Sequence, residues 1–216
     1  ANIAVNEADL VLALGVRFDD RVTGMVSEFI KHGKIIHIDI DRSELNKNKT
    51  VTLPIWADLR LALGQLLDAQ AADYSAWREY CRQQKARYPY PVAEKRGISP
   101  QRAIALLSDM TGGEAIVSLG VGQHQMYASQ YWKFDHPYTW INSGGLGTMG
   151  FSIPAAIGAK AGMPDSRVWA IDGDGCFQMT AQELVTATVV DIPIKVALPN
   201  TSYLGMVRQS QAMSYD

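Results

Sequence analysis

Short apolar segments alternate with segments of helical periodicity along almost the whole chain, and this alternation is the feature that most restricts the fold. Seven segments have the length and composition of buried strands: 9–15, 34–40, 54–57, 115–119, 138–142, 167–171 and 194–198. Helical patterns occupy 23–32, 58–70, 100–110, the residues after Gly122, 150–160 and 178–190. Strands that alternate with helices at this spacing favour a parallel sheet with crossover helices. The sequence therefore predicts an α/β protein.

A change of composition divides the alternation into two parts. Residues 71–97 are rich in Arg, Gln, Lys and Tyr, and they predict an exposed helix followed by an extended linker. Beyond them, Ser99 and Pro100 are residue types preferred at the N-cap and the first position of a helix. We therefore expect two doubly wound units with parallel sheets, at 1–70 and 98–216, joined by residues 71–97. Because the second unit stops within a helix-like segment, we expect it to be incomplete at its C-terminus and the chain to be part of a longer protein.

Composition and charge exclude several classes of function. Hydrophobic residues make up 47% of the chain and charged residues 19%, as is typical of a folded globular protein. A formal net charge of −2, without a dense Lys/Arg block, argues against a nucleic-acid partner. Because no apolar window of about 18 residues and no signal-peptide pattern is present, we expect no membrane partner and a cytoplasmic, bacterial location. Cys81 and Cys176 are expected to be reduced thiols.

Polar residues follow the last two predicted strands. Asp172 and Asp174 come directly after one strand, and Asn200 and Thr201 come after the next. Ligands of open α/β sheets bind beyond the carboxyl ends of the strands, so these oxygens could converge on a Mg²⁺ ion that bridges a diphosphate. The glycines of the Asp-Gly-Asp-Gly stretch would let the backbone approach a phosphate closely. A tight turn without a ligand is the alternative that the same residues allow.

The order and spacing of this stretch resemble the diphosphate-binding motif of thiamine-diphosphate enzymes, in which Gly-Asp-Gly begins the pattern and Asn-Asn closes it. Asp174 matches the metal-binding acid, but Thr201 stands where the second Asn, the usual ligand, is expected. Either Thr201 or Asn200 would then bind the metal, or metal binding would be impaired. Four further motifs resemble the catalytic subunit of acetolactate synthase, also called acetohydroxyacid synthase: GVRFDDRVTG (15–24), GVGQHQMYASQY (120–131), WINSGGLGTMGFSIPAAIGAK (140–160) and YLGMVRQ (203–209).

The resemblance implies sites for thiamine diphosphate, Mg²⁺ and FAD. The positions implied for thiamine diphosphate are Gln123, His124, Gly147, Met149, Asp174, Gly175, Cys176 and Tyr203. Those implied for the metal are Asp174, Thr201, Asn200 and the backbone oxygen of Tyr203. Those implied for FAD are Arg17, Asp19, Arg21, Val22, Asp39, Ile40, Asp58 and Leu59. Met149, Gln123 and Arg21 are the candidate catalytic residues, since Met149 would bend the cofactor and Arg21 would lie near the carboxylate of the second substrate.

Each of these positions also has a structural interpretation. Met149 could fill a helix core, and Arg17 with Asp19 could be a surface ion pair of little energetic consequence. Asp39 and Asp58 could cap the ends of strands.

The resemblance also implies a reaction. Pyruvate would be decarboxylated and joined to a second 2-oxo acid, giving 2-acetolactate or 2-aceto-2-hydroxybutyrate in branched-chain amino-acid biosynthesis, with FAD in a structural role. A homodimer or tetramer is the implied assembly, to which a small regulatory subunit could bind. The relay glutamate of the family lies on a pyrimidine-binding domain without a counterpart in this sequence, so we expect the chain as given to be inactive.

Three alternatives stay open. Ser210 stands where the family has Trp in its acceptor pocket and where glyoxylate carboligase has Ser, so a glyoxylate carboligase-like enzyme is one alternative. The motif GLGTMG (145–150) has the G-x-G-x-x-G pattern of an NAD-binding dehydrogenase, although Asp165 and Asp172 fit the ribose-binding position only loosely. A folded structural piece without catalytic activity is the third.

Overall fold

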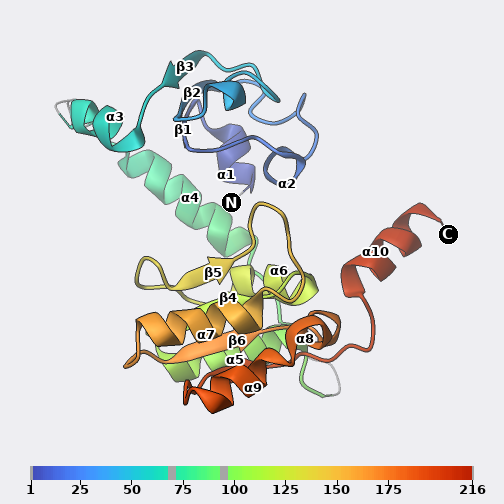
Figure 1. Cartoon of the computed structure of the whole chain (residues 1–216). Helices are drawn as coiled ribbons and strands as arrows, with labels where there is room; N and C mark the ends of the chain where they lie inside the picture. Colours follow the sequence, from blue (N-terminus) through green and yellow to red (C-terminus); the bar gives the residue numbers. More distant parts are fainter. Residues whose placement is uncertain (1, 68–71, 93–96, 216) are drawn as a thin grey trace. The chain divides into compact units, whose positions relative to one another are not determined.

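A computed structural model describes residues 2–67, 72–92 and 97–215. The chain divides into two compact units, Ala1–Pro89 and Tyr90–Asp216, and each is built on its own parallel sheet (Figure 1). The predicted fold class, α/β with two parallel-sheet units, is confirmed. Among the helices within the described ranges, none combines the length and apolarity needed to cross a membrane.

The first unit has a three-stranded sheet. Its elements are α1 (Asn2–Glu7), β1 (Leu10–Leu14), α2 (Asp20–Thr23), β2 (Lys34–Asp39), the 3₁₀ helix η1 (Arg42–Glu44), β3 (Leu53–Trp56), α3 (Leu59–Leu66) and α4 (Ser75–Arg87). The strand order is β1-β2-β3, and Leu14 pairs with Ile38, which in turn pairs with Ile55. Because the strands are parallel and in register, their carboxyl ends lie along one edge. The residues after β1, β2 and β3 therefore come together in space.

Apolar side chains from strands and loops form the core of the first unit. Ala13, Phe18, Ile30, Ile35 and Val51 are buried against one another. The opposite face of β1 carries Leu10, Leu12 and Leu14, which are exposed as the alternation of a strand dictates.

The helix predicted at 23–32 is wrong. The structure has only the four-residue helix α2 at this place, followed by turns that lead to β2. Gly24 and Ile30 have left-handed backbone conformations, with φ of 57° and 49°, and these interrupt a right-handed helix. Ile30 is nevertheless buried in the core. The spacing of apolar residues that predicted a helix therefore arises from residues that are buried from turns.

The second unit has a four-stranded sheet. Its elements are α5 (Pro100–Thr111), β4 (Ile116–Leu119), α6 (Gln123–Tyr131), β5 (Trp140–Asn142), α7 (Ser152–Gly162), β6 (Val168–Ile171), α8 (Asp174–Thr180), α9 (Glu183–Val189), β7 (Lys195–Ala197) and α10 (Gly205–Ser214). As expected, Ser99 caps α5: its hydroxyl accepts from the Arg102 N–H at 3.2 Å, and Pro100 occupies the first turn. The strand order is β5-β4-β6-β7, all parallel.

Helices cover both faces of this sheet (Figure 1). On one face, Ile104 of α5 and Ala128 of α6 pack with Val117 and Leu119 of β4. On the other face, Ile153 and other residues of α7 pack against β4 and β6, joined by α8 and α9. The central strand β4 is buried along its whole length, as a strand covered on both sides requires.

The single helix predicted at 178–190 is also corrected. Two helices occupy this region, and the first begins at Asp174, directly after Gly173, rather than near Gln178. The break follows Thr180, whose hydroxyl donates to the Gly150 carbonyl at 2.8 Å. This bond anchors the end of α8 to the loop that precedes α7. The helix predicted at 58–70 is present as α3 with Asp58 as its N-cap, and positions 68–70 lie outside the described residues.

Candidate functional site

The second sheet has a topological switch point at the ends of β4 and β6. From β4 the chain passes through α6 to β5 on one side, and from β5 it passes through α7 to β6 on the other side. The chain continues from β4 into α6 and from β6 into α8, and these two helices pack on opposite faces of the sheet, so the loops after β4 and β6 diverge. A crevice at such a point is where open α/β sheets bind their ligands.

A cavity of about 410 Å³ lies at this switch point. Its wall comes from the segments that follow β4, β6 and β7, together with Met149 and the start of α5. The residues that line it include Val121, Gly122, Gln123, His124, Tyr127, Met149, Gly173, Asp174, Gly175, Cys176, Pro199, Thr201, Tyr203, Leu204 and Gly205. Seven of the eight positions expected for thiamine diphosphate are among them. The eighth, Gly147, does not line the cavity, but a Cβ there would be 3.9 Å from the side chain of Val121, which does.

Three oxygen-bearing groups lie close together at this cavity. The Thr201 N–H donates to Asp174 Oδ1 at 3.4 Å, and the Thr201 hydroxyl donates to the Tyr203 carbonyl at 3.2 Å. Asn200 differs from them, because its Oδ1 accepts from the Ser202 N–H at 2.9 Å and so belongs to its own turn. Of the four expected metal ligands, Asp174, Thr201 and Tyr203 are brought together, and the Asn200 side chain is engaged elsewhere.

Met149, in the loop before α7, and Gln123, the first residue of α6, both line the cavity. The Met149 side chain approaches Gly175, where a Cβ would be 3.6 Å from its Cε atom. Gln123 Nε2 donates to Gln209 Oε1 at 3.1 Å, which connects the start of α6 to α10. A Cβ at Gly175 would lie 2.5 Å from Cδ2 of Leu204, so a side chain there would require Leu204 to move. Gly173 and Gly175 both line the cavity and do so with their backbone, since neither has a side chain.

A buried polar cluster, which we define as His124, Ser152, Asp172 and Cys176, adjoins the cavity, and its members His124 and Cys176 line the wall. The Ser152 hydroxyl donates to Asp172 Oδ2 at 2.6 Å, and Cys176 Sγ donates to the Val121 carbonyl at 3.0 Å. Burial lowers the pKa of His124 to about 4, against the opposing influence of Asp174. Burial likewise raises the pKa of Asp172 to about 6 and raises that of the Cys176 thiol. At neutral pH the cluster therefore holds a neutral imidazole, a carboxylate and a protonated thiol.

Three members of the cluster could in principle hold a cation. The ligand atoms of His124, Asp172 and Cys176 all lie within 4.8 Å of one another. However, the thiol is kept protonated and bonded to a backbone carbonyl, and one Asp172 oxygen is bonded to Ser152. The hard oxygen set of Asp174, Thr201 and Tyr203 suits Mg²⁺ better.

In the first unit, the residues expected to line FAD gather where the parallel strands end. Arg17 and Asp19 follow β1 and form an ion pair at 2.6 Å, and Asp19 also caps α2. Arg21 is largely exposed and lies 4.0 Å from Asp20, and Val22, on α2, is also exposed. Asp58 caps α3, which begins at Leu59.

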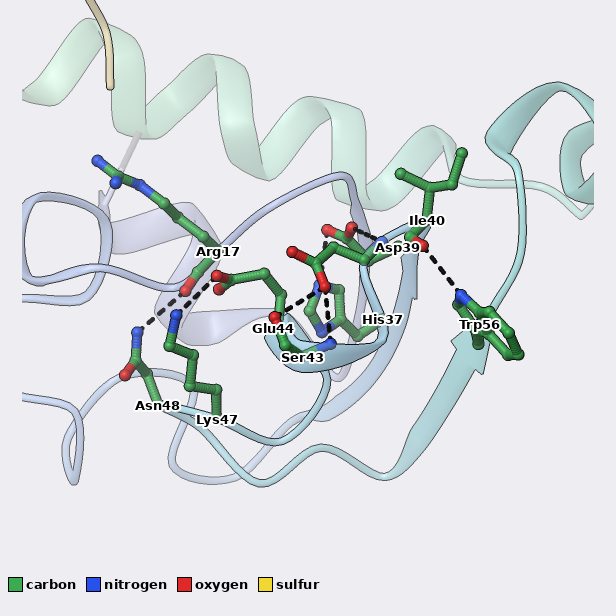
Figure 2. Close-up of polar contacts among 10 residues, drawn as sticks. Arg17, His37, Asp39, Ile40, Ser43, Glu44, Lys47, Asn48 and Trp56 are labelled. Atoms are coloured by element: carbon green, nitrogen blue, oxygen red, sulfur yellow. Dashed lines mark hydrogen bonds and ion pairs between the residues drawn. The ribbon is translucent and has the colours of Figure 1, made fainter. Parts of the chain in front are cut away.

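The polar contacts at the end of β2 are drawn in Figure 2. Asp39 Oδ1 accepts from the Asp41 N–H at 2.8 Å, and its Oδ2 lies 3.6 Å from His37 Nε2. The Ile40 carbonyl accepts from Trp56 Nε1 at 2.9 Å, while the Ile40 side chain is exposed. Both ring nitrogens of the buried His37 have no hydrogen-bond partner within the described residues. The sequence did not predict that His37 and Trp56 take part in contacts at this edge. Both stand among apolar residues of predicted strands, so nothing near them in the sequence indicated a polar site.

Sequence reasoning also missed part of the cavity wall in the second unit. Tyr127, Pro199 and Leu204 line it, and each stands within a few residues of a predicted site residue. Asp172 was expected at the open edge of the sheet. It is instead fully buried and does not line the cavity.

Two models of known protein domains match the chain. A model of the thiamine pyrophosphate enzyme C-terminal TPP binding domain matches residues 120–216, and a model of the thiamine pyrophosphate enzyme central domain matches residues 1–66. The chain belongs to the thiamine pyrophosphate enzymes. Thiamine pyrophosphate is another name for thiamine diphosphate, so the family supports the cofactor expected for this cavity.

Similarity to acetolactate synthases extends over the whole chain. The acetolactate synthase large subunit of Corynebacterium glutamicum is 53% identical over 99% of the chain, which corresponds to 35% of the relative. Acetolactate synthase 2, chloroplastic, of Nicotiana tabacum is 49% identical over 100% of the chain and 34% of the relative. An acetolactate synthase large subunit of Mycobacterium tuberculosis is 46% identical over 98% of the chain and 36% of the relative. The chain is thus a homologue of these large subunits and spans about a third of their length.

These similarities favour the acetolactate synthase interpretation over the alternatives. The GLGTMG motif does lie between β5 and α7, as a dinucleotide fingerprint would. Asp172 at the end of β6, however, is buried and bonded to Ser152, so it cannot receive a ribose. The glyoxylate carboligase-like and dehydrogenase alternatives are therefore not favoured.

Proposed function

We propose that these residues form part of an acetolactate synthase catalytic subunit that decarboxylates pyruvate and joins it to a second 2-oxo acid. The observation that carries the proposal is the position of the cavity at the switch point between β4 and β6, with the oxygens of Asp174, Thr201 and Tyr203 at its wall. Similarity to acetolactate synthases over the whole chain supports the same activity.

The residues of the cavity fit thiamine diphosphate and Mg²⁺. Asp174, the Thr201 hydroxyl and the Tyr203 carbonyl would hold the ion, and their hard oxygens match its preference. The glycine backbone at 173–175, which lines the cavity, would hold the diphosphate. Met149 would contact the thiamine portion of the cofactor. When bound, the cofactor supplies the stabilised carbanion chemistry that decarboxylation requires.

FAD binding belongs to the first unit in this proposal. The residues at the carboxyl ends of β1, β2 and β3 lie along one edge, and His37 and Glu44 there have buried polar atoms without partners among the described residues. Unpaired buried groups are costly unless something completes their hydrogen bonds. FAD would have a structural role, and Arg21 would recognise the carboxylate of the second 2-oxo acid.

The assembly and the acceptor substrate are further parts of the proposal. A homodimer or tetramer is consistent with the apolar side chains of Leu10 and Leu12, which are about half exposed on the outer face of β1. Ser210 would leave more room in the acceptor pocket than the Trp usual in the family. A small regulatory subunit could bind such an assembly, and the bacterial relatives favour a cytoplasmic location.

The test is the binding of thiamine diphosphate with Mg²⁺ to the chain, measured by isothermal titration calorimetry. Asp174→Ala is expected to weaken binding more than tenfold, because it removes the only carboxylate among the three proposed ligands. Thr201→Ala is expected to weaken it by a smaller factor of about threefold to tenfold, corresponding to roughly 1 kcal/mol for one neutral ligand group.

Asn200→Ala is the matched control. Its side chain is bonded to Ser202 within its own turn, so affinity is expected to change less than that of Thr201→Ala. A larger loss for Asn200→Ala than for Thr201→Ala would mean that Asn200 rotates to the metal. The absence of any binding to the unmodified chain would count against the proposed function.

A further inference from the structure

Trp56 is the last residue of β3 and is unusually exposed for a tryptophan. Its exposed fraction is 63%, although tryptophan is among the side chains that bury most surface in folded proteins. The ring is nevertheless held in place, because Nε1 donates to the Ile40 carbonyl at 2.9 Å (Figure 2). A flat apolar surface is thus fixed in one orientation at the carboxyl edge of the first sheet.

Two charged side chains lie next to this ring. Asp39, the last residue of β2, is the register partner of Trp56, so the two residues stand side by side where adjacent strands end. Asp39 Oδ1 accepts from the Asp41 N–H at 2.8 Å, which fixes the carboxylate. Arg42 Cζ lies 5.8 Å from the centroid of the Trp56 ring, within the range of a cation–π contact. An apolar plane, an acceptor and a cation therefore occur together at this edge.

The order of the strands gives the direction of a bound dinucleotide. In doubly wound sheets that bind dinucleotides, the turn after the first strand holds the phosphates, and an acid after the second strand accepts from the adenosine ribose. Here β1, β2 and β3 are neighbours in that order, Arg17 lies in the turn after β1, and Asp39 ends β2. Phosphates at the end of β1 and ribose at the end of β2 place the base, which is bonded to the ribose, at the end of β3. Trp56 stands at that end.

We propose that Trp56 is the stacking surface for the adenine ring of a dinucleotide bound to the first unit. The exposed indole binds the base by stacking, the Ile40 carbonyl keeps the indole in its orientation, and Arg42 adds a positive charge beside it. Trp56 is not among the positions that the resemblance implies for FAD. The proposal names a residue for the adenine half of FAD and rests on the FAD part of the proposed function.

The first test measures the affinity of the chain for ADP and for FAD by isothermal titration calorimetry. ADP is used because it is the adenosine diphosphate half of FAD without the flavin. Trp56→Ala is expected to lower both affinities about tenfold, since the stacking of one base on an aromatic side chain has an effect of this size. Trp56→Phe keeps an aromatic ring but removes the indole N–H, and it is expected to lower them less than about threefold.

Trp77→Ala is the matched control. Trp77 is also a partly exposed tryptophan of the first unit, but it lies on α4 and stacks on Tyr80, with ring centroids 5.2 Å apart. Its removal is expected to change either affinity less than about twofold. Far-UV circular dichroism is expected to show the same secondary structure for the Trp56 and Trp77 variants, because both side chains are partly exposed.

The second test locates the base directly by NMR. In the chain with bound ADP, nuclear Overhauser effects are expected between the ring protons of adenine and those of one tryptophan among the five in the sequence. Trp56→Phe is expected to remove these signals, which assigns that tryptophan as Trp56. Trp77→Phe is expected to leave them unchanged.

The outcomes separate the stacking role from the proposed function. If ADP binds in a way that depends on Trp56 but FAD does not bind, the stacking role stands and the FAD part of the proposed function falls. If FAD binds and Trp56→Ala keeps its affinity, the FAD part stands and the stacking role is overturned. The stacking role is also overturned if ADP does not bind to the unmodified chain, if Trp56→Ala and Trp77→Ala weaken binding equally, or if adenine contacts only another tryptophan.

Discussion

Gly120 lies at the point where β4 ends, directly above the buried polar cluster. A Cβ added there would overlap Asp172 Oδ1 and would lie 2.9 Å from His124 Nε2. Asp172 cannot move aside easily, because Ser152 and the β7 backbone hold it. Gly120→Ala is therefore expected to lower the free energy of unfolding by about 2–4 kcal/mol, measured by urea denaturation.

Gly145 offers a matched control for this substitution. It also lies in a loop after a strand, but a Cβ there would meet nothing within 4 Å, and its backbone is not in the left-handed region. Gly145→Ala is expected to change the free energy of unfolding by less than about 0.5 kcal/mol. Equal losses of unfolding free energy for the two variants would show that Asp172 and His124 move aside for a Cβ at Gly120 without measurable cost.

For single residues, the residue types predicted which oxygen-bearing side chains lie at the site better than they predicted where those side chains point. The sequence placed Asp174, Thr201 and Asn200 at one edge, because the carboxyl ends of parallel strands meet there. It could not tell that Asn200 would close its own turn onto Ser202 or that Asp172 would turn inward, since both depend on local backbone angles. Ser202, for example, has a φ of 57°.

Helix α5 depends on a cap that also belongs to the wall of the cavity. Ser99 accepts from the Arg102 N–H and satisfies one of the free donors of the first turn. Ser99→Ala is expected to lower the free energy of unfolding of the second unit by about 1 kcal/mol. Thermal and urea melts of the chain would measure the change.

Ser99→Asn restores a side-chain acceptor and is the control for the cap. It is expected to remain within about 0.5 kcal/mol of the unmodified chain. A loss as large as that of Ser99→Ala would mean that the serine contributes through something other than the cap.

The positions of strands were predictable from sequence, and those of some helices were not. Each of the seven strands lies within its predicted segment or shifts by one residue, because a buried strand needs a continuous apolar run of fixed length. The helix expected at 23–32 failed because apolar residues there, such as Phe29 and Ile30, pack from turns. The break between α8 and α9 depends on the Thr180–Gly150 bond, which joins segments 30 residues apart in sequence and has no local signal.

On the scale of the whole molecule, the residues proposed for thiamine diphosphate all belong to the second unit, Tyr90–Asp216. Ligand binding stabilises only the part of a protein that must unfold to release the ligand. At a hundred times its dissociation constant, thiamine diphosphate with Mg²⁺ is expected to slow the exchange of amides in β4 and β6 about a hundredfold. Amides of β2 in the first unit are expected to keep their rates, as measured by hydrogen exchange with mass spectrometry.

FAD provides the converse experiment. Its proposed contacts lie at the ends of β1, β2 and β3, so it is expected to protect the first sheet and leave β4 and β6 unchanged. Equal protection of both sheets by either cofactor would contradict this separation and would mean that the two units unfold as one.

The two thiols of the chain differ in their access to reagents. Cys176 is buried and bonded to the Val121 carbonyl, and its raised pKa keeps it in the unreactive thiol form, whereas Cys81 is partly exposed on the polar helix α4. A fluorescent maleimide or a spin label can therefore be attached at position 81 alone, without removing a cysteine from the wall of the cavity. The native sequence thus provides a built-in attachment point for spectroscopic probes in the first unit.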